Sequence, residues 1–250
     1  MFVINQKKSK MKLLSITALL SLLLFSCGSD KEELSVNFKL NHDSEPLVMF
    51  EEYEFGEAGG TPFEVTRFSF YISNVNLIID GESQRFVDVD FIDLSESHSS
   101  LERANEGFDY VLGETEGDAS SISFNLGLTP EQNATVPTDY PSSNVLSKTG
   151  EYWPGWESYV FVKIEGNIDV DRDGTKEQGF ALHLGSDDVL RSTSGDYSDD
   201  LTITFDLKDI FSCNGELYDL ESMPMIRSLA QLGEAMSLAD NFACGTSYDN

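Results

Sequence analysis

The chain has 250 residues, of which 40% are hydrophobic and 11% aromatic, enough to build a core, which argues against a disordered protein. Its 44 acidic and 16 basic residues give a formal net charge of −28. This excess of acid argues against nucleic-acid binding, because a protein that binds phosphates needs cations to neutralise them, and it suits solubility or the binding of cations.

The first 26 residues are typical of a lipoprotein signal peptide, which is removed from the mature chain. Four lysines precede an apolar run at 13–25 that is too short for an ordinary membrane span. The run ends in Leu24-Phe25-Ser26-Cys27-Gly28, which resembles the lipobox of bacterial lipoproteins. The resemblance implies that Cys27 is lipidated and anchors an outer membrane lipoprotein, periplasmic or surface-exposed. The alternative is a plain secretory signal with an incidental cysteine.

An acidic segment at 27–34 follows, and we expect it to be a linker between Cys27 and the folded domain. The stretch Ser29-Asp30-Lys31-Glu32-Glu33 resembles the acidic export tags of surface lipoproteins in Bacteroidota. A simple solvated linker is the alternative, because runs of like charge are commonly solvated.

From residue 35 onward the chain has the pattern of many short strands separated by turns. Residues 36–42 alternate apolar and polar side chains, as a half-buried strand does. Residues 63–79 predict two strands that meet at a bulge near Ser73-Asn74, where the apolar parity shifts. Asp80-Gly81 is typical of a hairpin turn before a return strand at 86–94. Further strands are expected near residues 47–53, 108–111, 121–127, 159–165, 179–184 and 201–207.

Only near the C-terminal end does the apolar pattern change from strand-like to helix-like spacing. Between Ser222 and Ala239 the apolar residues fall at helical intervals, with Ser222 as a candidate cap, which predicts a helix at about 222–240. The whole pattern predicts an all-β fold, an antiparallel Greek-key β-sandwich with a short C-terminal helix. We expect one domain, spanning residues 35–250.

Two cysteines remain once Cys27 is assigned to lipid. In an exported protein such a pair usually forms a disulfide, which here would join Cys213 to Cys244 and hold the C-terminal tail on the domain. The alternative is a soft copper site built on their thiolates.

An acidic loop has the composition of a calcium site. In Asp169-Val170-Asp171-Arg172-Asp173-Gly174-Thr175-Lys176-Glu177 the spacing places three carboxylates round one hard cation. Phe180 stands where an EF-hand has its glutamate, so the loop is not an EF-hand. The alternative is an ordinary acidic turn in a β-hairpin. The candidate calcium ligands are Asp169, Asp171, Asp173, Thr175 and Glu177.

The three histidines differ in their surroundings. His183 lies in a strand whose bulky residues share the other face, so it should point away from the apolar side. His42 ends the first strand beside a turn, and His98 lies among serines, where we expect an exposed loop residue. A neutral imidazole suits copper or zinc, whereas a lone strand histidine is usually structural.

The only two tryptophans, Trp153 and Trp156, flank a Pro-Gly turn just before a strand. They could form a hydrophobic plug, stack on a sugar ring, or supply an electron-rich indole for redox chemistry near a metal. Trp156 is also a candidate for stacking on a ligand. The sequence has no nucleophile elbow and no HExxH motif, and it has no Cys/His pairing for nucleophilic catalysis, so we do not expect an enzyme.

These segments in this order resemble the MbnP-like family, lipoproteins or periplasmic proteins that are associated with copper handling and were first recognised in methanobactin operons. The resemblance spans most of residues 34–210. The segments that carry it are Phe38 to His42, Phe68 to Val75, Phe124 to Gly127, Trp153 to Gly166 and Phe180 to Gly185.

The resemblance implies a copper site with a modified side chain. In the family, a partner di-haem enzyme of the cytochrome c peroxidase/MauG type oxidises the first tryptophan of a W-x-W motif to kynurenine, which supports binding of one copper ion. Trp153 matches that first tryptophan, while Gly155 falls on the second position and Trp156 is displaced by one residue. His42 and His183 match the family's histidines. We therefore expect Cu(I) to be held by both histidines and by Trp153 as kynurenine.

Two alternatives remain open at the level of the sequence. One is a non-enzymatic surface binding module that uses Trp153 and Trp156 for a glycan or protein partner and calcium for stability. The other is a degenerate relative that keeps only the scaffold. One geometric observation separates these functions: a copper site requires His42, His183 and Trp153 to lie within metal-bridging distance.

Overall fold

The computed structural model describes residues 31–56, 60–213 and 217–249. The predicted signal peptide and Cys27 lie outside the described residues, as does most of the predicted linker. The last linker residues, Glu32 to Leu34, belong instead to the first strand, because they pair with residues 113–115 of another strand. In the part of the chain that the structure describes, no helix is long and apolar enough to cross a membrane.

Strands make up most of the described chain. They are β1 (Glu32–His42), β2 (Glu45–Pro46), β3 (Tyr53–Phe55), β4 (Thr61–Ile79), β5 (Glu82–Asp93), β6 (Phe108–Thr115), β7 (Ala119–Leu126), β8 (Tyr152–Trp153), β9 (Ser158–Ile168), β10 (Gln178–Gly185), β11 (Arg191–Asp196), β12 (Thr202–Asp206), β13 (Met225–Ile226) and β14 (Thr246–Asp249). The helices are α1 (Leu101–Glu106), α2 (Pro130–Asn133), α3 (Leu207–Phe211), α4 (Leu232–Asn241) and the 3-10 helices η1 (Pro137–Asp139), η2 (Val145–Ser147), η3 (Thr149–Glu151), η4 (Asp187–Val189) and η6 (Leu229–Gln231).

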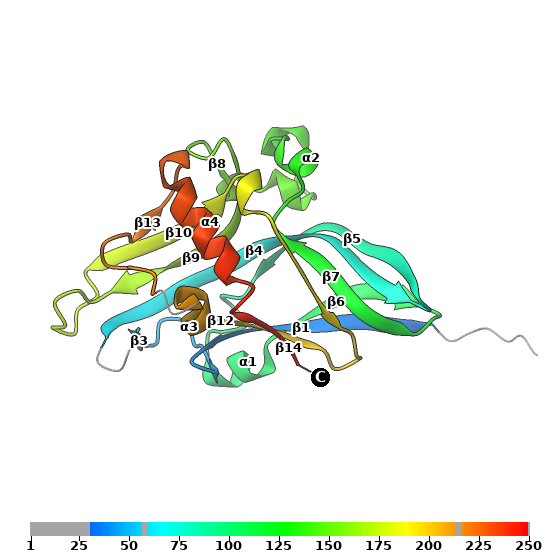
Figure 1. The fold of residues 1–250 in the computed structure, drawn as a ribbon, viewed down its shortest axis with the longest axis horizontal. Helices are drawn as coiled ribbons and strands as arrows, with labels where there is room; N and C mark the ends of the chain where they lie inside the picture. Colours follow the sequence, from blue (N-terminus) through cyan, green and yellow to red (C-terminus); the bar gives the residue numbers. More distant parts are fainter. Residues whose placement is uncertain (1–30, 57–59, 214–216, 250) are drawn as a thin grey trace, which may run out of the picture. The chain divides into compact units, whose positions relative to one another are not determined.

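The strands form two main sheets (Figure 1). The five-stranded sheet has the order β14-β12-β1-β2, with β6 also paired to β1. The nine-stranded sheet has the order β11-β7-β4-β9-β10-β13, with β3 and β5 paired to β4 and β8 paired to β9. The pairs β1–β12 and β10–β13 run parallel, which the sequence did not indicate. The predicted all-β sandwich with a short helix near its C-terminus is confirmed.

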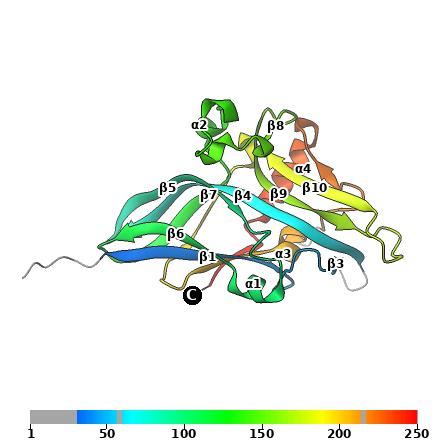
Figure 2. The ribbon, with the colours of Figure 1, turned by 180° about the vertical axis from the view of Figure 1, so that it is seen from behind.

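Apolar side chains of alternate strand residues fill the space between the sheets. Phe38 of β1 meets Phe70 of β4 edge-on, with ring centroids 5.7 Å apart, and stacks on Phe205 of β12 at 6.4 Å. All three rings are almost fully buried. Seen from behind in Figure 2, β1 and β6 run along one side of β4 and β5. Each aromatic pair of this kind stabilises by about 0.5–1.5 kcal/mol beyond its buried area, so the first strand is tied to elements far along the chain.

The predicted bulge lies inside one long strand rather than between two. β4 continues through Asn74, whose φ is +50°, and its register against β7 shifts between Ser73 and Asn76. Past the bulge, Asp80 and Gly81 both have positive φ, at +52° and +85°. Two such residues form the hairpin turn that matches the twist of the flanking strands, and β5 returns along β4 as predicted.

The C-terminal helix begins later than the predicted range of 222–240. Residues 225–226 form β13 beside β10, and the carbonyl of Pro224 accepts a hydrogen bond from the Ala181 N–H. The pairing with β10 explains the difference, because it holds residues 225–226 in extended backbone, which a helix across this segment would not allow. Ser222 therefore does not cap α4, which buries Leu238 on its apolar face.

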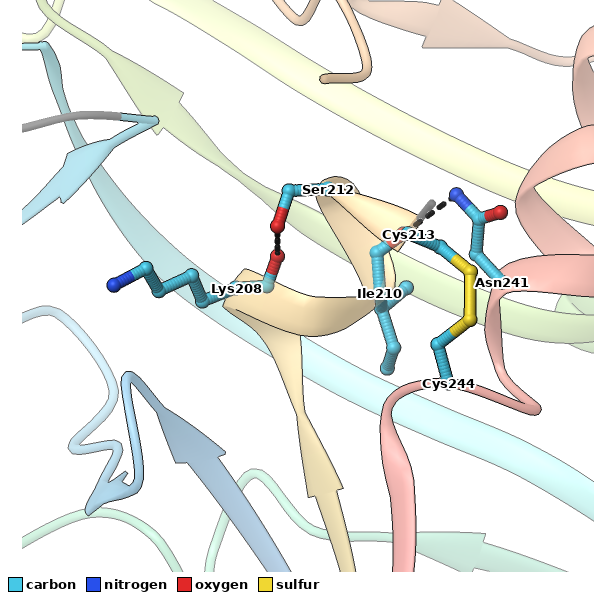
Figure 3. Close-up of a disulfide and its surroundings, with 6 residues drawn as sticks. All are labelled: Lys208, Ile210, Ser212, Cys213, Asn241 and Cys244. Atoms are coloured by element: carbon cyan, nitrogen blue, oxygen red, sulfur yellow. Dashed lines mark hydrogen bonds between the residues drawn. A yellow bond between two sulfur atoms is a disulfide. The ribbon is translucent and has the colours of Figure 1, made fainter. Parts of the chain in front are cut away.

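The two predicted cysteines are joined by a disulfide (Figure 3). Cys213 follows α3 and Cys244 precedes β14, with their Cα atoms 5.9 Å apart. Beside the bond, Asn241 Nδ2 donates to the carbonyl of Ile210 at 2.8 Å. A link across 31 positions stabilises by roughly 3–4 kcal/mol on the chain-entropy model. In this state neither sulfur is a free thiolate for copper.

Candidate functional site

The outer face of the nine-stranded sheet carries a row of polar side chains across three strands. Ser69 of β4 pairs with Lys163 of β9, which pairs with His183 of β10. Their neighbours along the strands, such as Ile164 and Leu182, are fully buried in the core on the other face. Since strand side chains alternate between faces, His183 points away from the apolar side, as predicted.

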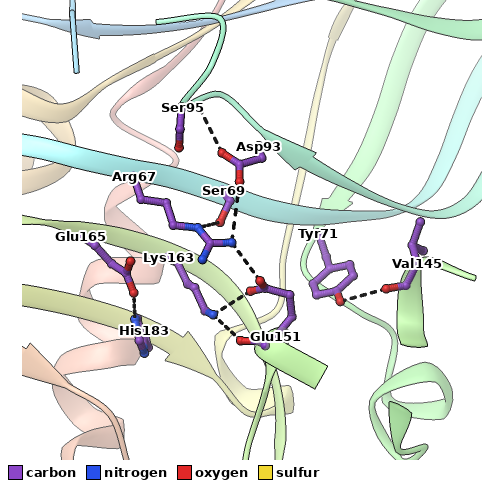
Figure 4. A network of polar contacts seen from close by, with 11 residues as sticks. Arg67, Ser69, Tyr71, Asp93, Ser95, Val145, Glu151, Lys163, Glu165 and His183 are labelled. Atoms are coloured by element: carbon purple, nitrogen blue, oxygen red, sulfur yellow. Dashed lines mark hydrogen bonds and ion pairs between the residues drawn. The ribbon is translucent and has the colours of Figure 1, made fainter. Parts of the chain in front are cut away.

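The loop before β8 is bound to this face by buried charges (Figure 4). Glu151 is 6% exposed, and its carboxylate lies 2.8 Å from Arg67 Nη2 and 2.8 Å from Lys163 Nζ. Lys163 also donates to the carbonyl of Gly150 at 2.5 Å. Two cations from neighbouring strands therefore hold one carboxylate of the loop, and Trp153 follows it by two residues.

The two nitrogens of the His183 imidazole have different surroundings. Nε2 lies 2.6 Å from Glu165 Oε1, and this hydrogen bond lowers the pKa of the Glu165 carboxyl, which thus accepts as a carboxylate. Nδ1 is buried and has no hydrogen-bond partner among the described residues. A buried polar atom without a partner is costly, and it marks a place where a ligand would be stabilised. A neutral imidazole that donates through Nε2 presents its free electron pair at Nδ1.

Trp153 lies beside His183. The two rings meet edge-on, with centroids 6.0 Å apart. The backbone that places the indole is a tight turn, in which Trp156 N donates to the Trp153 carbonyl at 3.0 Å, and β8 pairs with the start of β9. Gly155 is required in this turn, since a Cβ there would come within 2.7 Å of Trp153 Nε1 and 2.8 Å of the Arg227 carbonyl.

Trp156 has a different environment from Trp153. It is 2% exposed and belongs to the hydrophobic core. Its ring lies against Gly185, where a Cβ would be 2.7 Å from Cγ of the indole. This burial leaves no exposed ring face on which a sugar could stack, so the geometry supports the hydrophobic plug for Trp156 rather than the ligand-stacking role.

His42 packs inside the sandwich. Its ring meets Tyr53 and Phe63 edge-on, with centroids 5.3 Å and 5.2 Å away, and its Nε2 lies 3.1 Å from the Glu54 carbonyl. Burial lowers the pKa of His42, so its imidazole is neutral in the folded protein at neutral pH. This is a buried, largely aromatic environment, and Nδ1 of His42, like that of His183, has no hydrogen-bond partner among the described residues; unlike His183, His42 has no tryptophan beside it.

The two histidines expected to share copper lie far apart. His42 packs against Phe63, whereas His183 lies level with Ser69 through the strand pairs. The six positions from residue 63 to residue 69 span roughly 20 Å at about 3.3 Å per residue, and the two imidazoles lie on opposite faces of the sheet. The structure brings Trp153 to His183 and does not bring His42 to either, so the predicted copper site of His42, His183 and Trp153 together is wrong, and only the pair of His183 and Trp153 remains as a candidate.

His98 is not the exposed loop residue that its serine-rich surroundings predicted. It is fully buried, and its Nε2 accepts a hydrogen bond from the Leu40 N–H at 2.9 Å. The flanking Ser97 and the carbonyl of Leu94 lie near its Nδ1. The loop folds over the edge of β1, and the polar neighbours conceal this in the sequence.

The acidic loop joins β9 to β10, as predicted for a hairpin. Oxygen atoms of Asp169, Asp171 and Glu177 lie within 4.8 Å of one another, and Asp169 is 1% exposed. The Asp173 carboxylate does not belong to this group, and its Oδ1 accepts from the Thr175 N–H at 2.8 Å instead. The Asp173 N–H donates to Asp169 Oδ1 at 3.2 Å, so backbone amides of the loop already satisfy part of the cluster.

Comparison with known proteins identifies the family. A model of the MbnP family matches residues 31–224. The solved structure of MbnP from Methylosinus trichosporium is similar with a TM-score of 0.54, at 14% sequence identity, over 76% of this chain and 80% of that chain, which shows a shared fold. None of the curated proteins matches the chain. Since the family model covers more than half of the chain, this protein belongs to the MbnP family.

Proposed function

We propose that this chain is a copper-binding protein of the cell envelope, in which His183 and an oxidised Trp153 hold one copper ion. The MbnP family is associated with copper. The observation that carries the proposal is the buried, unpartnered Nδ1 of His183 next to the indole of Trp153. The expected two-histidine set is reduced to His183, because His42 lies in the core.

The surroundings of His183 suit a metal ligand. A metal-binding imidazole commonly donates its other N–H to a carboxylate, which fixes the tautomer and the ring orientation, and Glu165 is such a carboxylate. Imidazole nitrogen is a good donor to copper, and Cu(I) accepts few ligands. When bound, copper would occupy the buried Nδ1 side of the ring, where no described residue offers a hydrogen bond.

Trp153 supplies the second donor after oxidation to kynurenine. That change cleaves the C2–C3 bond of the indole with the two oxygen atoms of O2, leaving C3 as a ketone and C2 as a formamide; hydrolysis by water then releases C2 as formate and leaves an aromatic amine. The oxidising partner would be a di-haem enzyme of the cytochrome c peroxidase/MauG type. The half-buried Trp153 remains partly open to such a partner, whereas Trp156 is sealed in the core. The chain itself has no catalytic role in this proposal, and a lipid on Cys27 would anchor it to the outer membrane.

Metal analysis of matched histidine variants tests the proposal. Protein would be purified from the native host, with intact mass used to detect the change at Trp153. We expect the wild type and His42→Gln to carry copper, and His183→Gln to lose it while keeping its thermal melt. Copper retained by His183→Gln, or an unmodified and copper-free wild type in cells that contain the di-haem enzyme, would overturn the proposal.

A surface binding module stabilised by calcium is the second candidate. It is favoured by the convergence of Asp169, Asp171 and Glu177 within 4.8 Å in a hairpin loop, since three carboxylates offer the hard oxygen ligands that calcium prefers. This function does not require copper, and the two sites use different residues. A single chain could carry both.

A further inference from the structure

β13 adds a short strand to the sheet beside His183. Met225 pairs with Ala181 and Ile226 pairs with Leu182, in parallel. Ile226 and Leu182 are fully buried in the core. Paired residues share a face and successive residues alternate, so Met225 lies on the opposite, outer face together with Ala181 and His183. Met225 is half-buried there.

The backbone of Met225 is fixed from both sides. On one side, Ala181 N donates to the carbonyl of Pro224 at 2.8 Å. On the other, Gln231 Nε2 donates to the Met225 carbonyl at 2.5 Å, and Gln231 Oε1 accepts from the Arg227 N–H at 3.0 Å. The side-chain amide of Gln231 thus makes the hydrogen bonds that the backbone of a further strand would make along this edge of β13. This arrangement holds the position of Met225, although β13 has only two residues.

The same segment supports the turn that carries Trp153. The carbonyl of Arg227 lies against Gly155, and Leu229 N donates to the Gly155 carbonyl at 3.3 Å. His183 is two residues beyond Ala181, the partner of Met225, and such diagonal neighbours are about 7–8 Å apart, within reach of a long side chain. Strand register therefore places Met225 and His183 as diagonal neighbours on the outer face, and the indole of Trp153 contacts His183 there.

We propose that the Met225 sulfur is a further ligand of the metal at His183 and selects Cu(I). This rests on the copper function proposed above and adds to it a ligand that accounts for the expected Cu(I) state. A thioether is a soft, neutral donor that favours Cu(I) over Zn²⁺ and over the harder Cu(II). Imidazole alone does not discriminate among these ions in this way. Met225 lies 72 positions after Trp153 in the sequence. The proposed set of ligands is therefore complete only when β13 has paired with β10.

The chain offers a matched control for this residue. Met223 lies two positions earlier, packs against the hydrophobic core, and accepts a hydrogen bond from the Tyr218 hydroxyl at its carbonyl. Leucine replaces methionine at similar volume and at a small cost in stability. Met225→Leu and Met223→Leu therefore remove one sulfur each, one from the outer face beside His183 and one from a half-buried position against the core.

Copper titration and X-ray absorption test the proposal. Full-length protein from the native host, stripped of metal, would compete with a coloured chelator for Cu(I) under anaerobic conditions, and the copper K-edge would report its neighbouring atoms. We expect a copper–sulfur distance in the wild type and in Met223→Leu. Met225→Leu should lose it and bind Cu(I) about tenfold or more weakly, with Zn²⁺ binding unchanged.

Two results would overturn the ligand role of Met225. One is a wild-type spectrum with nitrogen and oxygen neighbours alone, and the other is equal Cu(I) affinity in Met225→Leu and the wild type. Both leave copper binding at His183 standing. Failure of the copper function itself has a different signature, because neither the wild type nor any variant would then compete with the chelator for Cu(I).

Discussion

His98 is a titratable residue that the fold keeps neutral. The Leu40 N–H donates to Nε2, so the ring proton is on Nδ1, close to the carbonyl of Leu94 at 3.1 Å. Burial lowers the pKa of His98 from 6.5 to about 4, because protonation would place an unsolvated charge in the core and set a second N–H against that of Leu40. The folded protein therefore binds this proton less readily than the unfolded chain.

We predict that this residue makes the protein lose stability in mild acid. Above pH 6.5 His98 is neutral in both the folded and the unfolded state, and its contribution to the free energy of unfolding is fully present. As the pH falls toward 4, the unfolded chain binds a proton at His98 that the folded protein does not bind, so the free energy of unfolding decreases. The loss should approach roughly 3 kcal/mol at pH 4. Urea denaturation of the wild type and His98→Gln between pH 7 and 4 would measure it. Parallel stability curves for the two proteins would contradict the prediction.

Single residues also show what a sequence reveals of a site. The outward direction of the His183 side chain could be predicted from strand alternation. Trp153 could be singled out because it precedes a Pro-Gly turn next to a strand. Glu165 was missed, although the alternation of β9 places it on the face of Lys163 and the hairpin turn brings that face beside His183. Met225 could not be found, because β13 pairs in parallel with β10 across a long connection that no local pattern encodes.

At the scale of elements, the loop from β7 to β8 depends on one carboxylate. Glu151 lies between Lys163, whose side chain is 6% exposed, and Arg67, which is 28% exposed and also lies 3.7 Å from Asp93. Taking these charges out of water is costly, and the cost is offset only while the opposite charges remain together. The ion cluster therefore orients the loop more than it stabilises the fold.

We predict that Glu151→Gln destabilises the protein by roughly 3 kcal/mol, because Lys163 keeps a buried charge without its partner. The loop should also loosen, so that Trp153 becomes more accessible to a fluorescence quencher. Glu114→Gln is the control: Glu114 forms an exposed ion pair with Lys31, and its loss should change little. Equal unfolding free energies for the two variants would contradict the destabilisation, and unchanged quenching of Trp153 would show that the Glu151 cluster does not hold the loop.

Element types were more predictable than their ends and partners. The hairpin at Asp80-Gly81 and the bulge near Asn74 have local causes, since positive φ is favoured at such residues, and both are confirmed. The helix prediction at 222–240 began too early, because residues 225–226 pair with β10, a contact that the local apolar spacing does not encode. The first strand was extended at its start by pairing with β6, a contact that sequence periodicity cannot anticipate.

At the scale of the whole molecule, the net charge of −28 makes cations the natural stabilising ligands. We predict that Ca²⁺ raises the melting temperature by binding the folded state at Asp169, Asp171 and Glu177; at a hundredfold excess over the dissociation constant the gain is about 2.7 kcal/mol. Differential scanning calorimetry with calcium, and then with a chelator, would measure it.

Two controls separate a site from general charge screening. Asp169→Asn should abolish the calcium effect, whereas Glu102→Gln, which removes an exposed carboxylate of α1, should leave it intact. Magnesium at equal concentration should stabilise less, because it is smaller and loses its water reluctantly. A similar gain in Asp169→Asn would assign the effect to screening.

The pairing of β1 with β12 has a consequence for how the protein is made. The Ser35 N–H meets the Tyr197 hydroxyl 162 positions away, and β1 itself pairs with residues 202–206. A chain that emerges from its N-terminus exposes β1 well before that partner exists, and closing so long a loop slows folding. Until β12 arrives, one edge of β1 is an open template for other chains. The first strand must therefore be kept from self-association until nearly the whole polypeptide has been made.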